Sequence, residues 1–245
     1  MQILDAVKAR TPWTIRNLTR RIKREIHWAR NARLPARKVF KAIYDENAWG
    51  SHESGDYYSG PGSDSGPAHA YADGIRKFIA ANHISSVVDL GCGDFRVGSM
   101  LINGDVRYIG VDIVDDLVTV NGKRFGSQNI QFQCVDIIRE PLPDGELCLI
   151  REVFQHLSNS EILRVLPKLR KYRYAIYTDY QPPASALTLP NRDIAHGRDT
   201  RLWKGSALFL DQPPFNIETE LLFETRVSRY ISCPGERIST YLIRP

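Results

Sequence analysis

Residues 87–98 read V-V-D-L-G-C-G-D-F-R-V-G, a short apolar β-branched run followed by a glycine-rich turn. The run predicts a buried strand over residues 86–90, with Asp89 near its end. Gly91 and Gly93 stand in the turn where the backbone must approach a ligand closely. The stretch therefore predicts the first strand and first ligand-binding turn of an α/β sheet.

Alternating strand and helix patterns continue outward from this stretch. The expected parallel strands cover residues 86–90, 108–111, 130–135, 147–150 and 174–177. Helical patterns occupy residues 68–82, 100–102, 117–125 and 160–171. This alternation predicts a parallel sheet with helices on both faces. Two late β-like runs, 222–231 and 238–243, predict a closing antiparallel hairpin.

Acidic residues follow successive strands. Asp89, Asp112 and Asp136 end the first three strands, and Glu152 and Asp179 follow the next two. Ligands of such sheets bind beyond the carboxyl ends of the strands, so these carboxylates are expected at one site. Asp112 lies 19 residues beyond Gly93, where a carboxylate can bind both hydroxyls of a ribose.

A dinucleotide and S-adenosylmethionine (SAM) both fit this pattern. The glycines do not form G-x-G-x-x-G, because the third of the set is Gly98. Asp89 and Asp94 are unfavourable beside a pyrophosphate but suit a sulfonium and an ammonium. After the fifth strand the chain closes with a hairpin and does not begin a second mononucleotide half. These three features favour SAM.

Four motifs resemble the class I SAM-dependent methyltransferases over residues 68–245. They are D-L-G-C-G (89–93), G-V-D-I (110–113), C-V-D-I (134–137) and L-I-R-E-V-F-Q-H-L (149–157). The resemblance implies a Rossmann-like α/β fold with a seven-stranded sheet and a C-terminal antiparallel hairpin. It places the first motif against methionine, Asp112 on ribose, and Asp136 on the adenine amine. The expected cofactor-binding residues are Asp89, Gly91, Gly93, Asp112, Ile113, Asp136, Ile137 and Glu152.

A narrower resemblance concerns the class of acceptor. W-G-S-H-E-S (49–54), S-G-P-G-S (59–63) and G-C-G-D-F (91–95) are similar to a bacterial methyltransferase subgroup that often occurs with polysaccharide synthesis. This similarity implies O-methylation of a sugar or glycan hydroxyl in the biosynthesis of surface polysaccharide. An RNA methyltransferase and a non-catalytic SAM-binding adaptor are the alternatives.

A hydroxyl acceptor favours a general base, because its proton must leave. His156 is the first candidate, since it follows the fourth strand. Glu152 stands four residues earlier, so in a helical turn the two would share one face, and Glu152 could orient the imidazole. Asp179, after the fifth strand, is the alternative base.

Two segments without regular patterns are candidates for acceptor binding. Residues 49–67 are rich in glycine and proline and predict a lid loop, with a simple tether as the alternative. Residues 181–216 predict an irregular excursion that supplies acceptor specificity or only satisfies its own turns. The expected substrate-binding residues are Trp49, Glu53, Tyr57, Asn191, Asp193, Arg198 and Trp203.

Residues 1–48 predict a basic helical arm. Residues 1–43 hold twelve Lys or Arg against Asp5 and Glu25, whereas the remainder holds 21 basic and 26 acidic groups. The apolar positions, at helical spacing, are Ile15, Leu18, Ile22, Ile26 and Ala29. Such a helix can lie on an anionic membrane, or pack on the body or on a second subunit. RNA is a less favoured partner, and a second short helix is expected around residues 37–44.

Composition excludes several classes of protein. The chain has 245 residues, 42% hydrophobic and 25% charged, which is ordinary for a globular protein and unlike a disordered or collagen-like one. No apolar run approaches the roughly 18 residues of a membrane span. Its four cysteines lack C-x-x-C spacing, so no zinc site is expected. With no secretory signal, a cytoplasmic location is expected, with the arm attaching at the inner face of the membrane.

Overall fold

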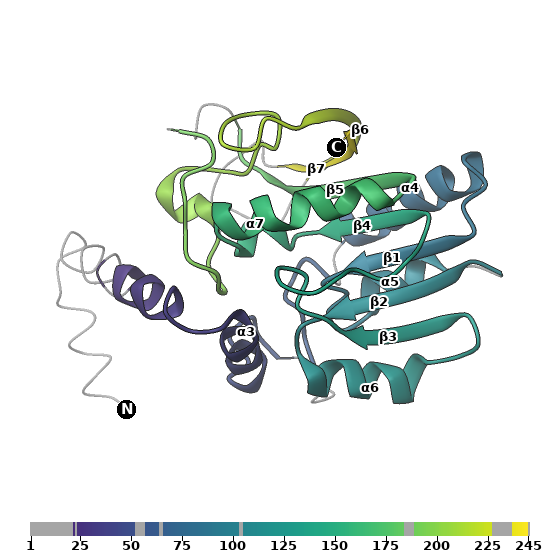
Figure 1. The fold of residues 1–245 in the computed structure, drawn as a ribbon, viewed down its shortest axis with the longest axis horizontal. Coiled ribbons are helices and arrows are strands. Elements are labelled where there is room, and N and C mark those ends of the chain that lie inside the picture. Colours follow the sequence, from purple (N-terminus) through teal and green to yellow (C-terminus); the bar gives the residue numbers. More distant parts are fainter. Residues whose placement is uncertain are drawn as a thin grey trace.

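A computed structural model shows one seven-stranded sheet flanked by helices (Figure 1). It describes residues 22, 24–51, 57–63, 66–102, 105–183, 189–226 and 237–244 of the chain. The strands are β1 (Ser86–Leu90), β2 (Arg107–Asp112), β3 (Ile130–Cys134), β4 (Leu147–Arg151), β5 (Tyr174–Gln181), β6 (Glu218–Arg226) and β7 (Arg237–Arg244). Their order in the sheet is β3-β2-β1-β4-β5-β7-β6.

The first five strands are parallel, and β7 lies antiparallel between β5 and β6. The predicted α/β sheet and its closing antiparallel pair are therefore confirmed. The prediction began the hairpin at residue 222, but β6 begins at Glu218. The polar residues Glu218 and Glu220 are exposed on this edge strand, which obscured its start in the sequence.

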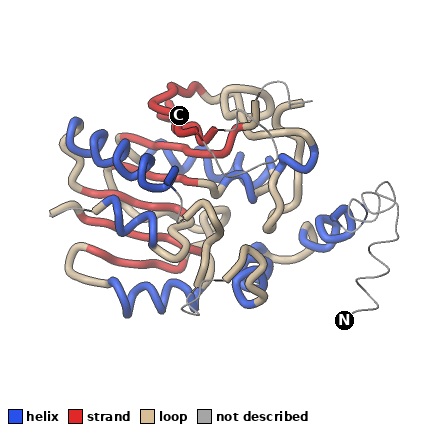
Figure 2. The backbone as a smooth tube through the Cα atoms, turned by 180° about the vertical axis from the view of Figure 1, so that it is seen from behind, coloured by secondary structure: helices blue, strands red, loops and turns tan. Residues whose placement is uncertain are grey.

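Helices cover both faces of the sheet, as the view from behind also shows (Figure 2). They are α3 (Ala36–Asp45), α4 (Gly66–Ala81), α5 (Arg96–Leu101), α6 (Asp115–Phe125) and α7 (Asn159–Val165), with the 3₁₀ helices η1 (Phe154–His156), η2 (Leu166–Lys171) and η4 (Arg201–Lys204). The predicted second short helix of the arm corresponds to α3. The helix expected over residues 160–171 is instead divided at Leu166, because Pro167 has no N–H to continue the α-helical ladder.

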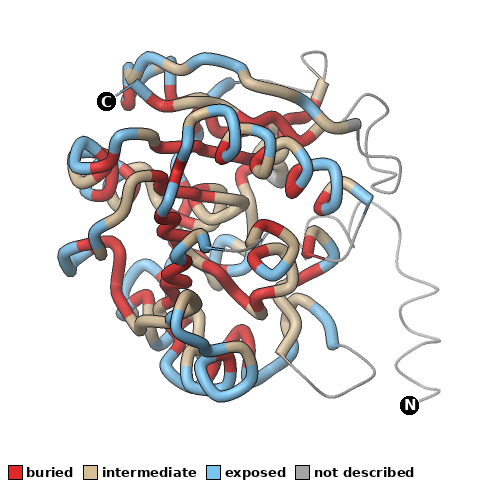
Figure 3. The backbone as a smooth tube through the Cα atoms, turned by 90° about the vertical axis from the view of Figure 1, so that its right-hand side faces the viewer, coloured by how far each residue is buried: buried red, intermediate tan, exposed pale blue. Residues whose placement is uncertain are grey.

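The two larger hydrophobic clusters of the described residues lie one on each face of the sheet. Val87 packs with residues of α4 and α5, whereas its neighbour Val88 packs with residues of α7 and η2. Successive strand residues point to opposite faces, so a strand that reads as a continuous apolar run is buried on both. Figure 3 shows the buried part of the backbone gathered along this central layer.

The described residues of the arm form two helices, residues 24–31 and α3, beside the carboxyl ends of the parallel strands (Figure 1). Ala36, Val39 and Ile43 bury one side of α3. The division of the chain at residues 48 and 67 stays a prediction. Within the described part of the chain, no helix is both long and apolar enough to cross a bilayer.

Candidate functional site

A cavity of about 570 Å³ opens at the carboxyl ends of the parallel strands. This volume falls in the range of small-molecule sites. Four of the five predicted strand-end acids line the cavity: Asp89, Asp112, Asp136 and Glu152. The alternation of strands and helices brings these distant residues to one edge of the sheet.

The turn after β1 requires glycine at two positions. Gly91 and Gly93 have φ angles of 72° and 55°, a region that disfavours residues with a Cβ. A Cβ at Gly93 would also lie 2.3 Å from the side-chain oxygen of Ser59. The turn thus lets residues 57–63 lie directly on it, where Ser59 and Asp94 exchange hydrogen bonds of 3.0 and 2.8 Å.

Asp89 lines the cavity and is buried. The hydroxyl of Tyr108 donates a 2.7 Å hydrogen bond to its Oδ2. Burial raises the pKa of Asp89 to about 6, against the opposing effects of Tyr108 and Arg151. The Asp89 carboxylate is therefore ionised at neutral pH and available to a cation in the cavity.

Asp112 is held by backbone donors. Gly93 N–H donates to its Oδ2 and Val114 N–H to its Oδ1, each over 3.1 Å. Burial raises the pKa of this carboxyl, and the backbone hydrogen bonds oppose the rise. Since a carboxylate has about four acceptor positions, further lone pairs remain for hydroxyl donors in the cavity.

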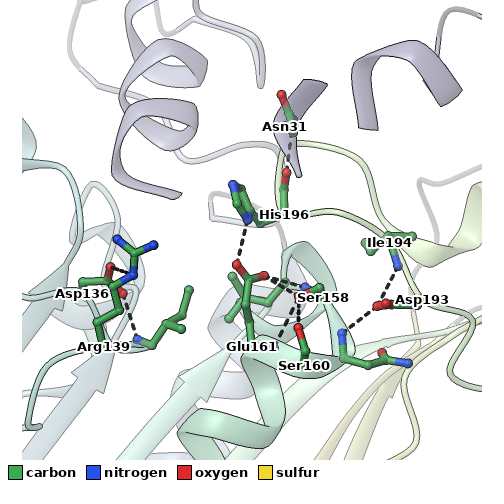
Figure 4. Close-up of polar contacts among 12 residues, drawn as sticks. Asn31, Asp136, Arg139, Ser158, Ser160, Glu161, Asp193, Ile194 and His196 are labelled. Atoms are coloured by element: carbon green, nitrogen blue, oxygen red, sulfur yellow. Dashed lines mark hydrogen bonds and ion pairs between the residues drawn. The ribbon is translucent and has the colours of Figure 1, made fainter. Parts of the chain in front are cut away.

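The turn after β3 is built in a similar way. Asp136 Oδ1 accepts from Ile138 N–H over 3.0 Å, and Arg139 Nε lies 3.9 Å from Oδ2 (Figure 4). Ile137, which follows Asp136, and Ile113, which follows Asp112, also line the cavity. This part of the lining therefore combines apolar side chains with a carboxylate, which suits an apolar ring that carries an amine.

Glu152 and Arg151 lie side by side at the end of β4. Arg151 Nη2 is 2.8 Å from Glu152 Oε1 and donates to the carbonyl of Gly62 over 2.9 Å. Glu152 has a φ of 55°, which turns the chain before η1 begins at Phe154. The expectation that Glu152 shares a helical face with His156 is therefore wrong, because no helix connects the two residues.

His156 lies in the cavity wall as a neutral imidazole. Its Nδ1 is 3.1 Å from the carbonyl of Gly197, and a carbonyl only accepts, so Nδ1 carries the proton and Nε2 a lone pair. Burial lowers the pKa of His156 to about 4, although the carbonyls of Gly197 and Asp199 oppose the shift. The Trp49 ring packs on it, with ring centroids 5.3 Å apart.

Asp179 does not line the large cavity. The sequence predicted that the fifth strand ends at residue 177, but β5 continues to Gln181 and keeps Asp179 inside the sheet. Its carboxylate accepts from Tyr177 O–H and Tyr180 N–H over 2.7 and 2.8 Å. Burial raises its pKa to about 7. The structure gives this side chain no access to the cavity as a base.

Aromatic residues of the N-terminal part close one side of the cavity. Trp49 lines it as predicted, and so do Phe40 and Tyr44, which sequence reasoning missed. Their spacing of four residues within α3 was the available signal, since it places both rings on one helical face. Tyr57 packs on Tyr44 with centroids 5.7 Å apart and is not in the lining. Glu53 lies outside the described residues.

The segment after β5 supplies one predicted residue, Arg198, to the lining. Asn191 lies elsewhere, and its amide donates to the carbonyls of Phe209 and Pro213 over 2.8 Å each. Asp193 does not line the cavity either: its Oδ1 accepts from the N–H of Ile194 and of Asn159, at the start of α7 (Figure 4). Both side chains hold backbone in place. The side chain of Trp203 lies outside the described part.

A metal site is not evident in the described part of the chain, where no group of three His, Cys, Asp or Glu side chains could hold an ion.

A search of protein-family models and one of curated proteins found no match. Solved structures do match. The chain aligns with magnesium protoporphyrin IX methyltransferase from Synechocystis, a structure with bound SAM, at a TM-score of 0.53 and 13% identity.

That alignment covers 86% of this chain and 98% of the other. The N-methyltransferase NodS from Bradyrhizobium japonicum aligns at a TM-score of 0.50 and 11% identity, over 74% of this chain and 99% of that one. This is the class I methyltransferase fold. The closing order β5-β7-β6 agrees with it. At such low identity the likeness concerns the fold, and the class I methyltransferase fold accepts many substrates.

Proposed function

We propose that this chain is a SAM-dependent methyltransferase that acts on a hydroxyl of a sugar or glycan in the biosynthesis of bacterial surface polysaccharide. One observation carries the proposal. A single cavity is lined both by the acids at the strand ends and by His156, whose Nε2 has a lone pair. Such a cavity has room for a nucleoside cofactor at one end and an acceptor at the other.

The residues at the ends of β1 to β4, which we call the cofactor zone of the cavity, have side chains that fit SAM. Asp112 would offer its remaining lone pairs to the two ribose hydroxyls, Ile113 and Ile137 would lie against the adenine, and Asp136 would accept from its amine. The turn at Gly91 and the carboxylates Asp89 and Glu152 suit a positively charged amino acid. When bound, SAM would supply a methyl group on a positively charged sulfur. A nucleophile that attacks the methyl carbon in line with the carbon–sulfur bond displaces the sulfur.

The part of the cavity around His156 and Trp49, which we call the acceptor zone, fits a hydroxyl acceptor. With SAM and acceptor bound, His156 would accept the hydroxyl proton at Nε2 while the methyl group passes from sulfur to the acceptor oxygen and S-adenosylhomocysteine is left. The hydrogen bond to the Gly197 carbonyl keeps the proton on Nδ1, so Nε2 carries the lone pair that can accept a proton. The Trp49 ring beside it offers a flat surface for the C–H face of a sugar, and Thr200 and Gln155 add polar groups to the lining.

The cofactor assignment is tested by Asp112→Ala. We expect wild-type chain to bind S-adenosylhomocysteine with micromolar affinity and the variant to lose at least ~100-fold, because two charge-assisted hydrogen bonds disappear. Isothermal titration calorimetry measures both. Asp115→Ala is the matched control, since Asp115 is an exposed aspartate three residues further on. Equal affinity in Asp112→Ala and wild type would refute the assignment.

His156→Asn tests the proposed base. Asparagine keeps the donor toward Gly197 but cannot accept a proton, so turnover should fall ~100-fold or more while S-adenosylhomocysteine still binds. The measurement is the release of S-adenosylhomocysteine with a panel of methyl glycosides as acceptors. Wild-type turnover in the variant would exclude His156 as the base and leave the cofactor assignment intact.

A further inference from the structure

The helix at residues 24–31 is attached to the body by one face only. Trp28 is buried, and the ammonium of Lys204 lies 4.4 Å from the centroid of its ring. Asn31 donates to the carbonyl of His196 over 3.1 Å (Figure 4). Arg24 lies 4.0 Å from Asp199. These contacts hold the helix against residues 196–204.

The opposite face of this helix is apolar and faces away from the body. Ile22 and Ile26, one turn apart, are 49% and 63% exposed, and Ala29 on the same side is also exposed. Positions 22, 26 and 29 share one side of a helix, and positions 24, 28 and 31 share the other. Packing on the body therefore does not use the apolar stripe found in the sequence.

Exposed basic side chains follow the two isoleucines in the chain. Arg30 lies one helical turn beyond Ile26 and Arg33 comes just after the helix, and neither has an ion-pair partner among the described residues; Glu25, next to Ile26, is also exposed. Over residues 1–43 twelve basic residues stand against two acidic ones. An anionic bilayer offers acyl chains to the isoleucines and phosphates to the basic side chains, so it matches both features of this surface.

We propose that this surface, defined by Ile22, Ile26, Arg30 and Arg33, docks on an anionic lipid bilayer. The isoleucines enter the boundary between headgroups and acyl chains, and the arginines contact lipid phosphates. Binding gains both from apolar burial and from attraction between opposite charges, and the attraction is screened by salt.

Docking also has a consequence for the cavity, and this consequence rests on the proposed function. Residues 196–204, to which the helix is attached, supply Arg198, Thr200 and Leu202 to the lining. A chain docked through this helix therefore holds the acceptor side of the cavity close to the lipid headgroups. This position suits a glycan acceptor carried on a membrane lipid.

Vesicle co-sedimentation of the full chain tests the docking. We expect binding to vesicles that contain phosphatidylglycerol, and affinity at least ~10-fold weaker for phosphatidylcholine alone or at high salt. The double variant Ile22→Ser, Ile26→Ser should bind the anionic vesicles ~10-fold more weakly or worse. The matched control is Leu163→Ser on α7, which is 42% exposed away from this surface, and it should bind like wild type.

Three results would overturn the proposal: equal binding to both kinds of vesicle, unchanged binding in the isoleucine variant, or an equal loss in Leu163→Ser. Retention of RNA without retention of vesicles would also reject it, and so would a dimer that the isoleucine substitutions dissociate in sedimentation velocity. Vesicle binding by a chain that fails to bind S-adenosylhomocysteine would support the docking and reject the proposed function, so the two can be distinguished.

Discussion

Three titratable side chains of the sheet and of the turn after β4 differ in what they can reach. Asp89 and His156 line the cavity, whereas Asp179 is directed into hydrogen bonds with Tyr177 and the backbone. Burial favours the neutral form of both His156 and Asp179, because it lowers the pKa of His156 to about 4 and raises that of Asp179 to about 7. Access to the cavity, and not the pKa, therefore separates a candidate base from a structural carboxyl.

The raised pKa of Asp179 predicts a pH-dependent stability. In the folded chain the carboxyl is protonated up to about pH 7, but its ordinary pKa is 3.8. Its contribution to stability is fully present below pH 3.8 and is lost as the pH rises to about 7. Between these values the folded state holds a proton that the unfolded state has released, so rising pH favours unfolding. Asp179→Asn should remove this loss, so its melting temperature should exceed that of wild type by several degrees at pH 8 and by little at pH 4.

Differential scanning calorimetry over this pH range measures the difference. Asp193→Asn is the control, because Asp193 is an exposed aspartate that also accepts from its neighbour's backbone N–H. A constant difference between wild type and Asp179→Asn at all pH values would contradict the burial of an ionisable carboxyl in β5.

At the scale of elements, a buried arginine of η4 holds the turn that carries His156. Arg201 is 1% exposed. Its guanidinium donates to the carbonyls of Phe154 and Leu157 and to the side chain of Asn159, over 3.2, 2.7 and 2.7 Å. Burial lowers the pKa of this group. The excursion after β5 thus fixes the position of η1, to which it is not adjacent in the sequence.

Replacing Arg201 by Met should release this turn. Buried carbonyls would lose their donor, so we expect the free energy of unfolding to fall by about 3 kcal/mol. Turnover should fall more than the affinity for S-adenosylhomocysteine, because η1 carries His156 and lies beyond the strand-end acids. Urea denaturation, calorimetry and a turnover assay measure the three effects.

The control for this prediction is Arg192→Met. Arg192 is exposed, and its guanidinium donates one hydrogen bond to the carbonyl of Lys204 over 3.3 Å. Stability and turnover should stay near wild type in this variant. Full turnover in Arg201→Met would show that the η1 turn keeps its position without the arginine.

At the scale of the whole molecule, the cavity is assembled from parts of the chain that are far apart in the sequence. Its walls come from α3, from residues 59–63, from the ends of β1, β2 and β4, and from residues 198–202. The sheet alone would leave the carboxyl ends of its strands open. The N-terminal part and the excursion after β5 enclose this edge from two sides, and the helix at residues 24–31 joins them through Asn31.

Much of the sheet and of the cofactor zone could be predicted because local patterns carry them. Apolar β-branched runs predict strands, and two glycines directly after such a run predict the turn at Gly91 and Gly93, where the structure has positive φ angles. Asp112 ends the next strand, 19 residues beyond Gly93, which predicts a ribose-binding carboxylate. The acceptor zone was less predictable. Asn191 and Asp193 are as polar as any sugar-binding residue, and nothing local separates a side chain that satisfies its own backbone from one that faces a ligand.

The sequence by itself determined the α/β class, the closing hairpin and the set of acids at the strand ends, because these depend on periodicities of two and 3.6 residues along the chain. Only the tertiary structure decided which groups have access. It directed Asp179 into β5, separated Glu152 from His156, and turned Ile22 and Ile26 away from the body. The physical reason is that burial and orientation result from packing between distant segments, which no local pattern encodes.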